Sequence, residues 1–355
     1  MSDPEPAHPR SGLIALLLGA ALAVSLTAST GSGVADLPAK GEDDAMGLLR
    51  DAARAARDLS YAGVQSVTSS SVGGTESQLV EVVHRPGEGT GFASASPQAE
   101  PDTPSIVVEP SPSLLKLDVE LLEELAANYR VTRSGIGVVG GQQATAVEAL
   151  RADGTAAGRF WIDDETLLPL RREVFDDAGR IAHSSAFLTV ETGARTGPLP
   201  GSTEQTGPWD DTLSGAELAE LRDEGWHAPE QLSWNLRLVE ARSTEDTGRP
   251  VVHLTYSDGL STVSVFTQRG RLIEKSPGTI EGLSAVVEDG GTVYVGDQGQ
   301  HRRVWESAGF VYTLLADAPP ELVTPVVAGF PKPEGTGFWA RVARGFDRLT
   351  RLGGW

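Results

Sequence analysis

The positions of apolar residues predict two amphipathic helices in the first half of the chain. Between residues 42 and 61, apolar side chains recur every three or four positions, at Met46, Leu49, Ala53, Ala56 and Leu59. This spacing places them on one face of a helix. The same spacing recurs between residues 114 and 129, so a second helix is expected there.

Alternating and β-prone stretches predict antiparallel strands around these helices. The candidate strand regions are residues 62–83, 106–109, 129–150, 158–163, 170–176 and 181–191. Asp164–Thr166 and Asp176–Gly179 have the composition of hairpin turns, so their flanking strands should pair with each other. Residues 86–104 are rich in Gly, Ser and Pro and predict a loop.

The second half of the chain predicts another strand-rich region. Residues 196–209 form a polar Pro/Gly linker, and Ser214 with Glu217 predicts a capping box at the start of a short helix. Strands follow from residue 236 to residue 317, and Pro319–Glu321 begins a last short helix. Strands and helices do not alternate regularly, which favours an α+β fold over a parallel doubly wound sheet.

The apolar run at residues 13–26 indicates export from the cytoplasm. It has 14 residues, whereas a membrane-spanning helix needs about 20. Arg10 precedes the run, and Gly33–Ala35 offers a small-residue cleavage site, as in a secretory signal. Both a cleaved signal peptide and an uncleaved anchor fit residues 1–35. We therefore expect an extracytoplasmic protein associated with the cell envelope.

Composition excludes several kinds of chemistry. The net charge of −20 disfavours nucleic-acid binding, and the absence of cysteine excludes a catalytic thiol, a disulfide and a thiolate metal site. Gly135–Gly140 matches the dinucleotide pattern GxGxxG, but no helix signature follows, so a glycine-rich β-turn is the better interpretation. No serine-hydrolase elbow occurs. We predict a non-enzyme with no cofactor.

No metal site is indicated either. The six histidines show no HxH or HxxxH spacing. Asp163, Asp164 and Glu165 lie between two predicted strands, where a solvated turn is the better interpretation than paired catalytic carboxylates or a calcium site.

The C-terminal segment, residues 338–352, is basic and amphipathic in an otherwise acidic chain. Its candidate membrane- or partner-docking residues are Phe338, Trp339, Arg341, Val342, Arg344, Phe346, Arg348 and Leu349. Aromatic and arginine residues on one helix suit a membrane surface or a docking partner. A terminal helix folded onto the acidic body fits the same pattern.

Four segments resemble the MucB/RseB family of extracytoplasmic regulators. They are residues 48–65, 125–154, 160–181 and the stretch HLTYSDGLSTVSVF at 253–266. The third is also similar to a hairpin of the wider lipoprotein-carrier superfamily of LolA, LolB and LppX. The fourth, which we expect to form a strand, a tight turn and a strand, separates the regulators from simple carriers.

The resemblance implies a fold and a division of the chain. The fold is α+β: a half-open, curved antiparallel LolA-like β-barrel with covering helices, followed by a smaller α+β domain. The implied parts are the leader (1–35), the N-terminal domain (36–195), a linker with a short helix (196–231), the C-terminal domain (232–328), and a hinge with the basic helix (329–355).

The resemblance also implies a function. Members of the family bind the extracytoplasmic part of a membrane-anchored anti-sigma factor and respond to an envelope ligand. A curved sheet of this kind suits an apolar ligand such as a lipid or a lipoprotein acyl chain. The alternative is a lipid or lipoprotein carrier without a signalling role, which needs only the first domain.

Overall fold

A computed structural model describes residues 41–71, 74–95, 119–193, 211–246, 249–272, 279–280, 283–288, 291–296 and 301–334. All of them belong to one compact unit that spans residues 39–355. The apolar run at residues 13–26, the linker at 196–209 and the basic segment at 338–352 lie outside the described residues, as does the predicted strand at 106–109.

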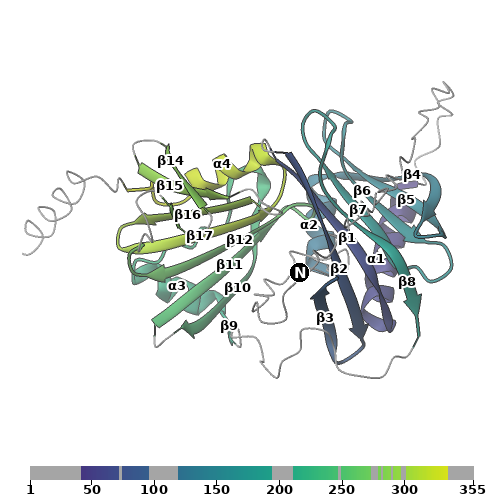
Figure 1. Cartoon of the computed structure of the whole chain (residues 1–355), viewed down its shortest axis with the longest axis horizontal. Coiled ribbons are helices and arrows are strands. Elements are labelled where there is room, and N and C mark those ends of the chain that lie inside the picture. The colour runs from purple at the N-terminus through teal and green to yellow at the C-terminus, as the bar shows by residue number, and fades with distance from the viewer. Residues whose placement is uncertain are drawn as a thin grey trace, which may run out of the picture. The chain divides into compact units, whose positions relative to one another are not determined.

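The first sheet is antiparallel and, within the described residues, has eight strands in the order β3-β2-β1-β8-β7-β6-β5-β4 (Figure 1). The strands are β1 (Tyr61–Ser71), β2 (Gly74–Arg85), β3 (Gly89–Ser94), β4 (Arg130–Val139), β5 (Gln142–Leu150), β6 (Ala156–Asp163), β7 (Pro169–Phe175) and β8 (Ile181–Thr192). The hairpins predicted around Asp164–Thr166 and Asp176–Gly179 are confirmed as β6–β7 and β7–β8.

This sheet is curved but open. The tip of the β4–β5 hairpin approaches β8, because a Cβ added to Gly140 would lie 3.1 Å from the carbonyl oxygen of Phe187. No ladder joins β4 to β8 in the described part of the sheet. The predicted fold class, α+β with a half-open curved antiparallel sheet, is therefore confirmed.

Two helices form the core of the first sheet with one of its faces. They are α1 (Gly41–Asp58) and α2 (Val119–Asn128). Leu49 of α1 and Leu125 of α2 are fully buried, in one cluster with strand residues such as Phe160. Burial of apolar side chains at these spacings is what stabilises both helices, so the two helix predictions are confirmed.

The second sheet is also antiparallel and has nine strands among the described residues, in the order β13-β14-β15-β16-β17-β12-β11-β10-β9 (Figure 1). The strands are β9 (Asp211–Thr212), β10 (Arg237–Asp246), β11 (Arg249–Ser257), β12 (Thr262–Arg269), β13 (Thr279–Ile280), β14 (Leu283–Glu288), β15 (Gly291–Gly296), β16 (His301–Ser307) and β17 (Phe310–Asp317).

Helices α3 (Gly215–Asp223) and α4 (Pro320–Ala328) contribute to the core of the second sheet. The predicted capping box is present, because Ser214 Oγ accepts a hydrogen bond from Glu217 N and the Glu217 carboxylate accepts one from Ser214 N. Helix α4 begins at Pro320, as predicted, where the missing N–H is not needed. A short 3-10 turn, η1 (Ser233–Asn235), precedes β10.

The glycine-rich stretch at residues 135–140 lies in a β-hairpin. Gly135 and Gly137 belong to β4, and Gly140 with Gly141 forms the turn, where both have positive φ values of 57° and 85°. A Cβ on Gly137 would lie 2.6 Å from the Trp161 ring, so glycine is needed there to seat the indole. The interpretation as a β-structure in place of a cofactor loop is confirmed, although two of the glycines lie in the strand itself.

The predicted loop at residues 86–104 is partly wrong, because β3 occupies Gly89–Ser94. Phe92 pairs with Val82 of β2 and packs against the first sheet's buried residues. A strand of small and polar residues forms here because β2 supplies the pairing partner and Phe92 an apolar anchor. Tertiary pairing therefore overrides a weak local preference.

Candidate functional site

The turn between β11 and β12, residues 257–261, is the most strongly buried turn-forming segment that the sequence singled out; we call it the docking turn. Its shape is set by its own polar groups. Ser257 Oγ donates to the carbonyl oxygen of Ser261 at 2.7 Å, and Asp258 Oδ1 accepts from the backbone N–H groups of Leu260 and Ser261 at 2.8 and 2.6 Å. The strand–turn–strand prediction for residues 253–266 is confirmed.

The docking turn projects from the second sheet into the core of the first. Leu260 is 2% exposed and belongs to the same buried cluster as Leu125 and Phe160. Two glycines make this approach possible. A Cβ on Gly158 would lie 2.8 Å from Leu260 Cδ2, and one on Gly259 would lie 2.7 Å from the carbonyl oxygen of Leu121.

Polar side chains from the end of α2, from the residue that follows it and from β7 bind the docking turn. Tyr129 donates its hydroxyl to Asp258 Oδ2 at 2.6 Å, and Asn128 Nδ2 donates to the Asp258 carbonyl oxygen at 3.1 Å. The Arg172 guanidinium donates to the carbonyl oxygen of Leu260. These bonds matter because an unsatisfied buried polar group costs about 1–3 kcal/mol.

Five ionisable residues are buried beside this contact. Arg172 and His183 come from β7 and β8, whereas Asp258 comes from the docking turn and His301 and Asp317 come from β16 and β17. His183 Nδ1 lies 4.0 Å from Asp317 Oδ1 and 3.1 Å from Ser69 Oγ. Burial raises the pKa of Asp258, although hydrogen bonds from Tyr129 and the turn backbone, and the charge of Arg172, oppose the shift.

The pKa of His183 makes stability depend on pH. Burial lowers this pKa below its ordinary value of 6.5; Asp317 opposes the shift, whereas Arg172 and His301 add to it. The folded state therefore binds this proton less tightly than the unfolded state does. His183 contributes stability that is fully present above about pH 6.5 and is lost as the pH falls below that value.

We accordingly expect the free energy of unfolding to decrease between about pH 7 and pH 5.5 more steeply in the wild type than in His183→Gln. Urea unfolding at several pH values measures both slopes. The pKa of Asp258 is raised above 3.8, so Asp258 contributes stability at low pH that is lost as the pH rises. Because Asp258 is present in both proteins, its contribution cancels when the two slopes are compared. Equal slopes would show that His183 is not the titrating group.

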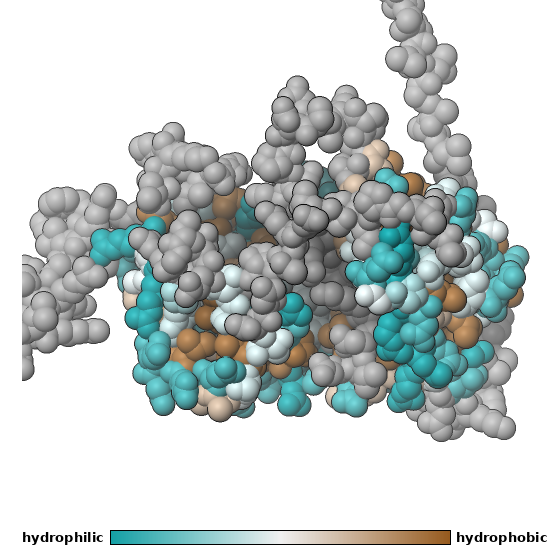
Figure 2. Space-filling model, turned by 90° about the horizontal axis from the view of Figure 1, so that it is seen from below, coloured by the Kyte–Doolittle hydropathy of each residue, from teal (hydrophilic) through white to brown (hydrophobic). Residues whose placement is uncertain are grey.

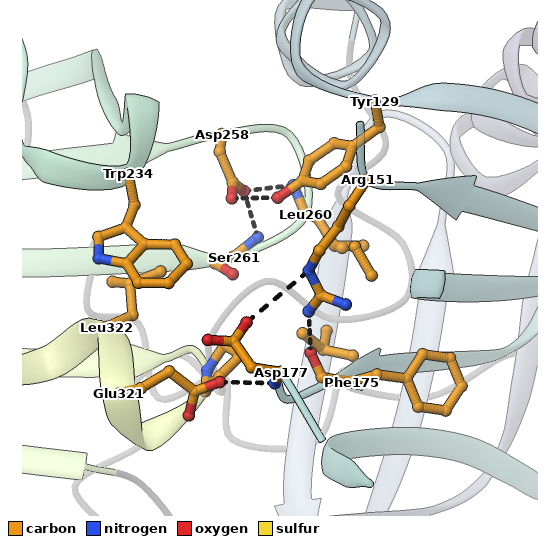
Figure 3. A pocket seen from close by; sticks show the side chains of 13 residues that line it. Tyr129, Arg151, Phe175, Asp177, Trp234, Asp258, Leu260, Ser261, Glu321 and Leu322 are labelled. Atoms are coloured by element: carbon orange, nitrogen blue, oxygen red, sulfur yellow. Dashed lines mark hydrogen bonds and ion pairs between the residues drawn. The ribbon is translucent and has the colours of Figure 1, made fainter. Parts of the chain in front are cut away.

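A small pocket lies beside the docking turn (Figure 3). It has a volume of about 30 Å³, which is far below the several hundred that ligand pockets usually have. Arg151 donates to the carbonyl oxygen of Phe175 at 2.7 Å, and the Asp177 N–H donates to Glu321 Oε1 at 2.9 Å. Trp234 faces the pocket, is 47% exposed, and has a positive φ of 63°. The pocket holds contacts between the sheets and is too small for an acyl chain.

The site residues predicted from the sequence fall into two groups, those outside the described residues and those that the structure describes. The eight docking candidates between Phe338 and Leu349 lie outside the described residues. Asp163, expected in a solvated turn, is buried, and its Oδ2 accepts from Thr166 N at 3.0 Å. That expectation is wrong for Asp163, because the carboxylate caps the β6–β7 turn from inside.

Other features bear on metal and membrane binding. Over the described ranges, no three His, Asp or Glu side chains converge as they would around a metal ion. None of the helices described is long and apolar enough to cross a membrane. The face seen in Figure 2 carries hydrophilic residues together with apolar patches.

Sequence reasoning missed the buried ionisable residues beside the docking turn, which are Arg172, His183, Asp258, His301 and Asp317. The first two lie in predicted strands where alternation cannot tell a buried face from an exposed one. Asp258 looked like ordinary turn chemistry. One signal in the sequence could have identified Arg172 as buried: it lies in β7 at the position that pairs with the apolar residue Phe160 of β6.

The fold defines an α+β protein with a curved, open antiparallel sheet joined to a second antiparallel sheet. Residues 76–206 match the model of the MucB/RseB N-terminal domain. The resemblance inferred from the sequence is therefore confirmed over residues 76–206. The match includes neither α1, β1 nor the docking turn.

Comparison with solved structures gives distant similarities. The crystal structure of MucB is 20% identical over 82% of this chain and 99% of that chain, with a TM-score of 0.44. The complex of Pseudomonas aeruginosa MucA/MucB is 19% identical over 82% of this chain and 100% of that chain, with a TM-score of 0.41. A LolA superfamily protein from Nitrosomonas europaea is 9% identical over 77% and 91%, with a TM-score of 0.18. No curated protein matches the chain.

Proposed function

We propose that this protein is an extracytoplasmic regulator of sigma-factor signalling that binds a membrane-anchored anti-sigma factor. The observation that carries the proposal is the match of residues 76–206 to the MucB/RseB N-terminal domain. In a structure of a protein to which this chain is similar, MucB is in complex with MucA(peri). An apolar envelope ligand would control release of the partner by favouring the unbound state.

The second sheet supports the regulator over the carrier. A carrier of the LolA type needs only a curved sheet with its covering helices. Here a second sheet of comparable size inserts a turn into the first, and Arg172 and Tyr129 bind that turn. This contact holds the two sheets together in one folded unit, which suits a protein whose function is binding.

The proposal also assigns the parts of the chain that surround the two sheets. Residues 1–35 deliver the protein to the envelope, and residues 329–355 bring it to the membrane through Trp339 and Phe346. Holding regulator and partner at the same surface raises their effective concentration. The domains are residues 36–195 and 232–328, joined by the linker segment 196–231.

The regulator is tested by recovering partners of the full chain from envelope extract and identifying the bound proteins and lipids. We expect a single-pass anti-sigma factor, and we expect deletion of the gene to change the output of its sigma factor. Lipid without a protein partner, together with unchanged sigma-factor output, would favour the carrier instead.

The domain assignment predicts a specific proteolysis pattern. Limited proteolysis should cut within residues 196–209, which are polar and rich in Pro and Gly. Because the docking turn is buried in the first sheet, the two fragments should stay together in gel filtration under native conditions and separate in denaturant. Fragments that separate without denaturant would contradict the docking described above.

A further inference from the structure

We propose that the docking turn is an internal competitor for an anionic amphiphile with a single alkyl chain. In the described state, Leu260 occupies an apolar site on the first sheet. The alkyl chain binds there only when the turn leaves, and its anionic head group binds Arg172. This inference builds on the proposed regulator, because it names the ligand class and the segment that the ligand displaces.

The apolar half of the site comes from the composition of one buried cluster. Its members belong to α1, α2 and strands β4 to β7, and among the described members Leu260 alone comes from the second sheet. Gly158 lines this position without a side chain, and a Cβ added there would clash with both methyl groups of Leu260. Withdrawal of the turn would therefore expose an apolar surface that an alkyl chain can cover.

The polar half of the site is Arg172. This guanidinium is 94% buried (6% exposed), and its Nη1 makes no hydrogen bond within the described residues. Its Nη2 donates to the carbonyl oxygen of Leu260, so this donor becomes free when the turn leaves. The two carboxylates that act on Arg172, Asp258 and Asp317, both belong to the second sheet. Separation of the sheets therefore leaves a cation beside an apolar surface, which recognises a carboxylate or phosphate head group.

The chain contains no cysteine, so a single introduced thiol reports on the docking turn without background. The experiment measures the rate at which a maleimide labels full-length Leu260→Cys, with and without dodecanoate below its micelle concentration. The matched control is Leu254→Cys, which is buried in the second sheet's own core. We expect dodecanoate to accelerate labelling at position 260 about tenfold or more and to leave position 254 unchanged.

Further arms test the head group and protect against misfolding. Neutral dodecyl maltoside, also below its micelle concentration, should accelerate labelling less than dodecanoate does, because it carries no anion for Arg172. If Leu260→Cys does not fold, Ser261→Cys in the same buried turn gives the same measurement. Acceleration that is absent at saturating dodecanoate, or equal at positions 254 and 260, overturns the inference. Recovery of the anti-sigma partner is measured in a separate experiment without ligand. A negative result in the labelling experiment would therefore not contradict the proposed regulator.

Discussion

Replacing Gly259 by alanine should destabilise the protein by about 3 kcal/mol or more. Gly259 has a φ of 90°, where an L-residue costs roughly 1–2 kcal/mol. The new Cβ would also lie 2.5 Å from Leu125 Cα and 2.7 Å from Leu121 O, both of which are helix backbone that cannot move aside cheaply. The docking turn would then be unable to seat in the first sheet. Urea unfolding measures the loss of stability, and limited proteolysis followed by gel filtration measures the loss of docking.

Gly154 provides the matched control for this substitution. Its φ is 87°, yet nothing lies within 4 Å of a Cβ placed there. Gly154→Ala therefore carries the conformational cost alone, about 1–2 kcal/mol, and should leave the proteolytic fragments associated. If the two alanine variants lose equal stability and both keep the fragments together, close packing of the docking turn against α2 is not important.

Replacing Arg172 by methionine should cost about 3–5 kcal/mol. The substitution keeps much of the side-chain volume but removes the cation that acts on Asp258 and Asp317. Removing one partner from a buried group of charges leaves the others uncompensated, which is why the expected cost is large. It also removes the hydrogen bond to the Leu260 carbonyl oxygen. Chemical denaturation at neutral pH gives the change in unfolding free energy.

Arg180→Met is the control for the loss of an arginine charge. Arg180 pairs with Asp176, but its side chain is 81% exposed. Water screens that ion pair, so we expect a loss of less than about 1 kcal/mol. Comparable losses at positions 172 and 180 would mean that the buried charges contribute no more than a surface ion pair.

Local patterns in the sequence determined most of the secondary structure. The spacing of Leu49 and its neighbours specified α1, and the turns at Asp164–Thr166 and Asp176–Gly179 specified two hairpins of the first sheet. Ser214 with Glu217 specified the start of α3. These predictions succeeded because each depends on residues a few positions apart, whose interactions are present before distant segments meet.

The tertiary structure alone decided which residues make the candidate site. Asp258 lies 129 positions from Tyr129, and Leu260 lies 88 positions from Arg172, yet these pairs are hydrogen-bonded. The strand β3 likewise exists because β2 pairs with it and Phe92 finds an apolar surface. The sequence of a turn determines the backbone conformation of that turn but not the surface against which the turn packs. Burial of Arg172 and Asp258 follows from how the two sheets close on each other, and that depends on the shape of the whole fold.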